Sequence, residues 1–210
     1  MRPWFAALVV AVGIVVSAGG SDADDVARAD TFVGRVEGSD AYIAISKDGR
    51  KIGGYLCDGV VVSRWLEYTW LEKGHAPLIA GTTGEELGSV HISGGTATGV
   101  IRVGDRDLPF LAERVHAGGD AGLYFAIAKQ PDRLLVGGWI LHPDGTQRGA
   151  VSRLNTRTLS PLPALPAPTL SPIVQIGGET GVPPVVAEPQ PLVVINIIAV
   201  LIGLLLPAVQ

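Results

Sequence analysis

The chain has 210 residues, of which 47% are hydrophobic and 17% are charged, and its formal net charge is −4. This composition is too apolar for a disordered chain, and the slightly acidic balance argues against a nucleic-acid partner. A single cysteine excludes an internal disulfide, and four scattered histidines lack the spacing of a zinc site. We therefore expect no metal and no cofactor.

The N-terminus has the pattern of a secretory signal peptide. Arg2 supplies a positive charge, an apolar run with glycine extends from Trp4 to Val16, and Val16-Ser17-Ala18 fits a signal peptidase site. The run is shorter than the ~20 residues that span a bilayer as a helix. We expect a signal peptide at 1–18, followed by an acidic mature N-terminus at 19–30. An uncleaved N-terminal anchor is the alternative.

Residues 31–157 form the expected folded domain, in which fourteen basic and fourteen acidic side chains balance. That neutrality argues against charge-driven binding to polymers of either sign. Short β-branched and aromatic runs alternate with Gly and Asp turns, and no βαβ alternation is visible. About ten short strands predict an all-β fold, an antiparallel β-barrel or sandwich. The expected strands are 31–36, 41–45, 51–57, 77–80, 87–92, 96–103, 108–115, 122–128, 134–141 and 147–154, and 60–71 is a bent strand or a short helical turn.

Several strings in this domain resemble a known group of proteins. They are Gly34-Arg35-Val36-x-Gly38, Asp40-Ala41-Tyr42-Ile43-Ala44, Tyr55-Leu56-Cys57-Asp58-Gly59, Ala121-Gly122-Leu123-Tyr124 and the segment from Gly138-Trp139-Ile140 to Asp144-Gly145-x-Gln147-Arg148-Gly149. Over residues 31–153 they resemble uncharacterised small secreted β domains of actinobacterial envelope proteins. The resemblance implies an exported β fold and no particular activity.

A proline-rich segment follows the domain. Residues 158–191 hold nine prolines, and their only charged residues are Glu179 and Glu188. Proline fixes φ and removes a backbone donor, so we expect a polyproline-like stalk without regular sheet. At ~3.1 Å per residue, such a stalk would reach up to about 100 Å.

The stretch from Leu192 to Val209 is uncharged, and Asn196 is its one polar side chain. As a helix it would be about 27 Å long, enough to cross the hydrocarbon core of a bilayer. We expect a transmembrane helix at 192–209 that anchors the exported domain in a membrane. The string VVINIIAVLIGLLLPAVQ resembles the hydrophobic segment of planctomycete type IV prepilin-like proteins. It follows the β domain, however, and lacks the prepilin cleavage motif, so the resemblance implies only an assembly-prone membrane helix.

Aromatic residues concentrate between 64 and 70. Trp65 and Trp70, with Tyr68 between them, are candidates for stacking on a sugar or peptide ligand. Arg64 and Glu67 beside them would form the polar rim. The alternative is that these rings cover one end of the core.

Other candidate chemistry is weaker. Cys57 is either a reactive thiol or a buried small apolar residue, and we expect the second because no histidine is marked out as its base. Asp105 and Asp107 flank Arg106, and we expect a solvated hairpin tip there rather than an acid–base pair.

These features predict an exported, membrane-tethered β module with a structural, display or recognition role at the cell envelope and without catalysis. Its expected partners are the membrane, through Leu192–Val209, and an envelope protein or glycan. Two alternatives remain open: a barrel enclosing a small apolar ligand, and an envelope hydrolase using Asp58, Asp144 or Cys57. A deep apolar cavity would favour the first, a carboxylate cluster in a cleft the second, and a filled core the recognition role.

Overall fold

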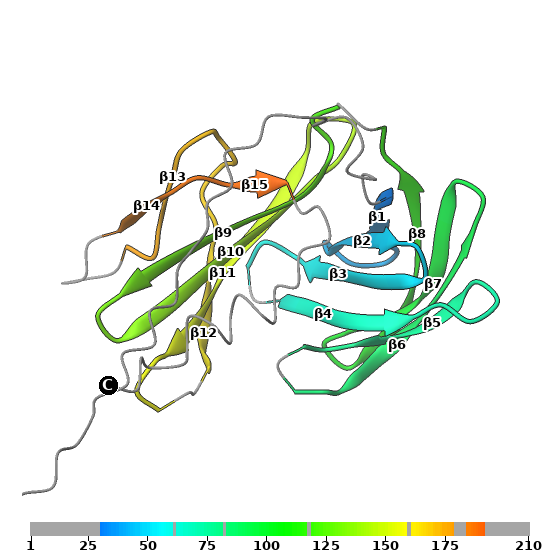
Figure 1. Cartoon of the computed structure of the whole chain (residues 1–210), viewed down its shortest axis with the longest axis horizontal. Helices are drawn as coiled ribbons and strands as arrows, with labels where there is room; N and C mark the ends of the chain where they lie inside the picture. The colour runs from blue at the N-terminus through cyan, green and yellow to red at the C-terminus, as the bar shows by residue number, and fades with distance from the viewer. Residues whose placement is uncertain are drawn as a thin grey trace, which may run out of the picture.

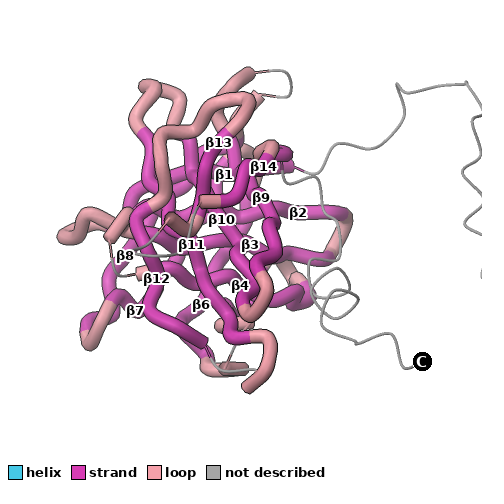
Figure 2. Tube along the Cα trace, turned by 90° about the vertical axis from the view of Figure 1, so that its left-hand side faces the viewer, coloured by secondary structure: helices cyan, strands magenta, loops and turns pink. Residues whose placement is uncertain are grey.

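A computed structural model describes residues 30–60, 62–81, 83–116, 119–158, 161–178 and 184–191. All regular secondary structure in these residues is strand, which confirms the predicted all-β class (Figures 1 and 2). The predicted signal peptide at 1–18 and the predicted transmembrane helix at 192–209 lie outside the described residues. Within the described ranges, no helix has the length and hydrophobicity needed to cross a membrane.

The strands between residues 30 and 157 match the predicted ranges closely, and the ambiguous segment 60–71 contains strand β4. They are β1 (Asp30–Val36), β2 (Tyr42–Asp48), β3 (Lys51–Cys57), β4 (Ser63–Trp70), β5 (His75–Ile79), β6 (Glu86–Ser93), β7 (Thr96–Val103), β8 (Arg106–Arg114), β9 (Gly122–Gln130), β10 (Arg133–Leu141) and β11 (Gln147–Asn155).

The larger sheet is an antiparallel, nearly closed barrel of eight strands in the order β4-β3-β2-β1-β8-β7-β6-β5. Its two outermost strands meet where Leu66 of β4 bridges Ala80, and the Gly81 amide donates to the Trp65 carbonyl at 2.8 Å. One apolar cluster of buried side chains occupies the interior. Its largest members include Phe32, Ile43, Ile45, Ile52, Leu56, Leu78, Ile101 and Phe110.

A second sheet, in the order β12-β11-β10-β9-β15, packs against the outside of the barrel (Figure 1). Leu123, Ile140 and Ala150 of this sheet share a cluster with Val33, Tyr42, Ala44, Tyr55 and Cys57 of the barrel. Side chains alternate along a strand, so Leu56 of β3 faces the barrel interior while Tyr55 faces the second sheet. Burial on both faces explains why β2 and β3 have continuous apolar runs.

The prediction that 158–191 is a stalk without sheet is wrong over its described residues. β12 (Pro161–Pro166) pairs with β11, β13 (Val174–Ile176) pairs with β14 (Val185–Ala187), and β15 (Gln190–Pro191) pairs with β9. Proline is tolerated because β12 and β15 are edge strands, whose outward-facing positions need no backbone donor. The segment therefore belongs to the folded unit.

The physical reason for this folding back lies in β10. Ile140 faces the barrel, whereas Leu135 and Trp139 point to the other side of the second sheet and are fully buried there. A strand that is apolar on both faces needs a cover on both, and Val174 and Ile176 help to supply the second cover. The Trp139 Nε1 also donates to the Pro168 carbonyl at 2.8 Å. The chain thus builds three layers: barrel, second sheet and proline-rich cover.

Candidate functional site

The aromatic residues singled out in the sequence lie on β4, beside β3. Lys51 pairs with Trp70 and Tyr55 pairs with Trp65, but the register shifts between Ile52 and Gly54. Across that shift, two residues of β4 oppose one residue of β3, which is a β-bulge. The bulge changes the alternation of β4, so that Trp65, Tyr68 and Trp70 all lie on the outer face of the barrel.

Trp65 is part of the contact between the layers. Its ring stacks on Tyr55 with centroids 4.3 Å apart and planes inclined at 33°. A Cβ on Gly138 of the second sheet would come within 2.8 Å of the Trp65 ring and 2.7 Å of the Tyr55 ring. The missing side chain at Gly138 therefore lets the two sheets approach over these rings. For Trp65, the structure matches the alternative that the ring covers a core.

Tyr68 and Trp70 are more accessible. The Tyr68 ring lies over Gly53, where a Cβ would meet it at 2.9 Å, and burial together with the Asp48 carboxylate raises the pKa of its phenol. The Trp70 side chain is 58% exposed, and the Lys51 ammonium lies 5.3 Å from its ring centroid. These contacts form the outer β4 face, which we define as Lys51, Tyr68 and Trp70.

Arg64, predicted to be the polar rim, does not belong to this face. Arg64 pairs with Leu56, whose side chain points into the barrel. The Arg64 side chain therefore leaves β4 on the face opposite to the three aromatic rings, and it is exposed. Lys51 and Asp48 stand near the rings instead. Sequence reasoning missed both, although pairing the Asp48–Lys51 hairpin with β4 in register would have located Lys51.

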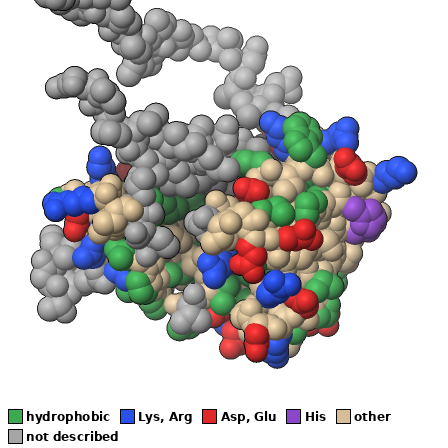
Figure 3. Space-filling model, turned by 90° about the horizontal axis from the view of Figure 1, so that it is seen from below, with side chains coloured by type: hydrophobic (Ala, Val, Ile, Leu, Met, Phe, Trp, Pro, Cys, Tyr) green, Lys and Arg blue, Asp and Glu red, His purple; other side chains and the backbone are tan. Residues whose placement is uncertain are grey.

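The described surface mixes charges of both signs. Figure 3 shows acidic and basic side chains interspersed over the face seen from below. This mixture agrees with the balanced charge of residues 31–157 and gives no single-sign patch on that face.

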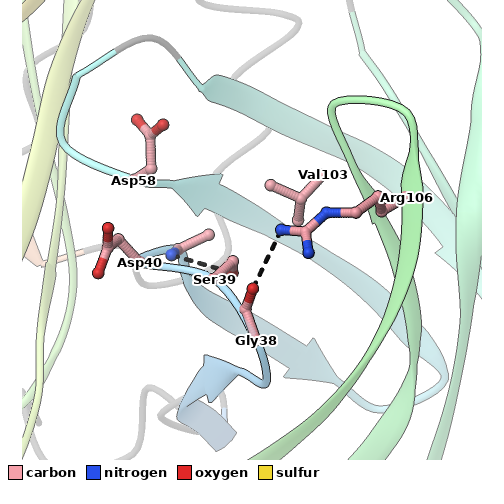
Figure 4. Close-up of a pocket in the computed structure, with 7 residues that line it drawn as sticks. Gly38, Ser39, Asp40, Asp58, Val103 and Arg106 are labelled. Carbon is pink, nitrogen blue, oxygen red and sulfur yellow. Dashed lines mark hydrogen bonds between the residues drawn. The ribbon is translucent and has the colours of Figure 1, made fainter.

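Loops at one end of the barrel line an open polar hollow of about 600 Å³ (Figure 4). It is lined by the β1–β2 turn, by Asp58 after β3, and by Val103 and Arg106 of the β7–β8 hairpin. A neighbouring hollow of about 370 Å³ shares Asp40 and Asp58 and extends to the second sheet. Its further lining residues include Gln147, Arg148, Gly149, Trp139 and Pro168. We call the two together the loop hollow.

The loop hollow contains two carboxylates, but they do not form a catalytic pair. The Asp58 Oδ1 accepts from the amides of Val60 at 2.8 Å and Val62 at 2.9 Å, so this carboxylate shapes the turn after β3. The Asp40 side chain is exposed, and Figure 4 shows the two carboxyl groups pointing in different directions. A general acid and base acting on one bond would have to converge on it.

The Asp144 carboxylate, another hydrolase candidate, joins the two sheets. It accepts from the Arg35 guanidinium at 2.6 Å and from the Thr146 hydroxyl and amide at 2.5 Å and 2.9 Å. Hydrogen bonds from Thr146, helped by His142 and Arg35, hold the pKa of Asp144 below its usual value. The Thr146 hydroxyl lies 2.8 Å from the Tyr42 hydroxyl of the barrel. Asp144 is therefore a charged structural contact.

Cys57 is buried, as predicted, and it is a free thiol. Its Sγ accepts from the Gly59 amide at 3.2 Å. Burial raises the pKa of the Cys57 thiol from 9.0 to about 11. Since the thiolate is the nucleophilic form, a thiol that stays protonated at neutral pH is a poor nucleophile.

In the described part of the chain, no three His, Cys, Asp or Glu side chains lie close enough together to hold a metal ion.

No known protein family and no curated protein matches this chain. Among solved structures, it is weakly similar to a chain assigned as a DNA polymerase III beta subunit from Eubacterium rectale. That match has 8% sequence identity, a TM-score of 0.15, and covers 79% of this chain and 57% of the other. A similarity at this level carries no argument about fold or function.

Proposed function

We propose that this chain is an exported, membrane-tethered β module that recognises a glycan of the cell envelope through the outer β4 face. One observation carries the proposal: Trp70 is 58% exposed on the same face as the half-buried Tyr68, with the Lys51 ammonium over its ring. An aromatic ring held on a strand loses little conformational freedom when it stacks on a ligand, so it suits recognition.

The chemistry of the outer β4 face favours a sugar. A sugar ring has an apolar C–H face that stacks on an aromatic ring and a rim of hydroxyls that donate and accept hydrogen bonds. Lys51 offers donors, and Asp48, whose carboxylate contributes to the raised pKa of Tyr68, offers acceptors. A proline-rich peptide would also stack, but prolines have no backbone N–H to donate to a carboxylate. The glycan therefore uses more of the groups present.

The two alternative functions have less support. The barrel interior is occupied by its own apolar side chains, which disfavours a small apolar ligand inside it. The hydrolase candidates are engaged elsewhere: Asp58 in a turn, Asp144 between the sheets and Cys57 as a buried thiol.

The folded-back segment changes the expected geometry of the tether. β15 pairs with β9 as far as Pro191, immediately before the stretch expected to enter the membrane. If 192–209 is the anchor, the β module would lie next to the bilayer rather than at the end of a 100 Å stalk, a length estimated for extended polyproline. The proposed recognition is therefore of glycans close to the membrane.

A glycan array followed by calorimetry on the best ligand tests the proposal. Replacing Trp70 with alanine should weaken binding about tenfold, corresponding to roughly 1.4 kcal/mol of lost stacking. Leu111→Ala is a matched control, because Leu111 is an apolar side chain of β8 that is 47% exposed. Arg64→Ala should also leave binding unchanged. The proposal is wrong if the protein binds no glycan, or if Trp70→Ala binds as tightly as the unmodified chain.

A further inference from the structure

The loop hollow carries charged side chains of both signs. Asp40 and Asp58 lie in it with Arg106 and Arg148. Among the ion pairs within the described residues, none involves Asp40, Arg106 or Arg148. Because Asp58 already accepts from the amides of its turn, the charges that face a ligand are those of Asp40 and the two arginines. These three groups are matched by a ligand that itself carries charges of both signs.

Both arginines are held in position by neutral groups. Arg106 donates to the Gly38 carbonyl at 3.0 Å, as Figure 4 shows. The Arg148 Nε donates to the Asp40 carbonyl at 3.3 Å, and its guanidinium carbon lies 5.0 Å from the centre of the Tyr42 ring. These contacts orient the guanidinium groups without neutralising them, and each keeps further N–H donors for a ligand.

We propose that the loop hollow binds a zwitterionic group that carries an ammonium and a phosphate, as phosphoethanolamine does. The phosphate would accept from Arg106 and Arg148, because its several oxygens can serve two guanidinium groups. The ammonium would lie at the exposed Asp40 carboxylate. Arg106 lines the hollow of about 600 Å³ and Arg148 the neighbouring one of about 370 Å³, and Asp40 lies in both, so the group would sit where the two meet.

A smaller zwitterion fits less well. An amino acid offers one carboxylate, which forms its best bidentate contact with a single guanidinium. The second arginine would then have no anionic partner. A simple anion would leave Asp40 unmatched, and a simple amine would leave both arginines unmatched.

Such a group comes either from a lipid headgroup or from a soluble molecule. The register of the second sheet places Pro191, the residue before the expected membrane segment, relative to the loop hollow, which matters for a lipid ligand. A row of paired residues crosses the second sheet from β15 to β11. Pro191 of β15 pairs with Tyr124 of β9, which pairs with Trp139 of β10, which pairs with Gly149 of β11. Three strand spacings of about 4.8 Å separate Pro191 from Gly149 by roughly 14 Å. Gly149 lines the loop hollow, so Pro191, the last residue that the structure describes, lies within about that distance of the hollow. Binding itself does not depend on the tether, but the lipid source does.

The experiment titrates the full-length protein in detergent micelles with phosphoethanolamine and, separately, with inorganic phosphate, ethanolamine and glycine. Saturable binding of phosphoethanolamine, at least about tenfold tighter than of the other three, is expected. Asp40→Asn and Arg106→Gln should each weaken it about tenfold. Asp105→Asn is the control, because it makes the same charge change as Asp40→Asn on a hairpin tip next to Arg106 without lining the hollow.

A second arm distinguishes the sources. The full-length protein in nanodiscs should show slower hydrogen exchange at the amides of the β1–β2 turn with phosphatidylethanolamine than with phosphatidylglycerol if the lipid is the ligand. Equal exchange in both, together with binding of free phosphoethanolamine, assigns a soluble ligand. The proposal is overturned if neither arm detects binding, if phosphate or glycine alone binds as tightly, or if both hollow variants bind as the unmodified chain does.

Discussion

Two tryptophans five positions apart on β4 lie in different environments, and their neighbours explain the difference. Trp65 stacks on Tyr55 under Gly138 of the second sheet, whereas Trp70 is 58% exposed beside Lys51. Burial, not residue type, therefore decides which of the two rings contributes to the stability of the fold.

The two alanine variants should therefore differ in stability. Trp65→Ala removes a large ring from the contact between the sheets and should lower the free energy of unfolding by about 3 kcal/mol. Trp70→Ala removes an exposed ring and should change it by less than about 0.5 kcal/mol. Urea unfolding of both variants checks this, and similar losses in the two would contradict the assignment of Trp65 to the contact between the sheets.

Cys57 gives a pH-dependent prediction. Its thiol has a pKa of about 11 in the folded protein, above the ordinary value of 9.0. A raised pKa means that the unfolded chain loses this proton first, so the contribution to stability is present below pH 9 and is lost as the pH rises towards 11. Cys57→Ala should show a smaller loss of stability over that interval in denaturant titrations.

Reactivity tests the same burial independently. A maleimide should label Cys57 in urea but not in the native protein at pH 7. Rapid native labelling, or a Cys57-dependent dimer on non-reducing gels, would show that the thiol is accessible after all.

At the scale of elements, the proline-rich segment is a structural cover. Val174, Ile176 and Ala187 are buried against the outer side of the second sheet, whose own side chains there include Trp139. Removing the cover would expose a large apolar surface, which destabilises a fold and promotes aggregation.

A chain ending at residue 157 should consequently aggregate or bind a hydrophobic dye, whereas one ending at 191 should remain monodisperse. Light scattering and dye fluorescence distinguish the two. Trp139→Phe is a milder variant that loses the hydrogen bond to the Pro168 carbonyl, at a cost of about 1–3 kcal/mol. A monodisperse chain ending at 157 that unfolds cooperatively would contradict the role of the cover.

At the scale of the whole molecule, the three layers end at Pro191, directly before the uncharged stretch 192–209. The proposed tether predicts that the full-length chain stays with membranes after a carbonate wash and that a chain ending at 191 is released. Equal recovery of both forms in the soluble fraction would refute the tether.

Much of the fold was predictable because its signals are local. The strands follow from β-branched and aromatic runs, and turns such as Lys47-Asp48-Gly49-Arg50 mark their ends. The fate of 158–191 was not predictable from proline content, because edge strands tolerate proline and the demand for a cover arises in β10. The doubly apolar run Leu134–Leu141 was the available signal.

The candidate site, too, was only partly predictable from the sequence. The sequence selected Tyr68 and Trp70, which lie on the outer β4 face. It also selected Trp65, which lies in the contact between the sheets, and Arg64, which lies on the opposite face of β4. The register shift opposite Gly53 decides to which face each of these side chains points. It depends on how β3 pairs with β4, which the sequence of β4 alone does not show.

By itself, the sequence determined the strand content, the turns and the burial of Cys57, because these follow from the hydrophobicity and backbone preferences of neighbouring residues. Only the tertiary structure decided that the barrel needs a second sheet and that this sheet needs a proline-rich cover. It also decided that Arg106 and Arg148 line two neighbouring hollows that share Asp40 and Asp58. Those outcomes depend on which surfaces are left apolar, and which loops are brought together, once distant strands have paired.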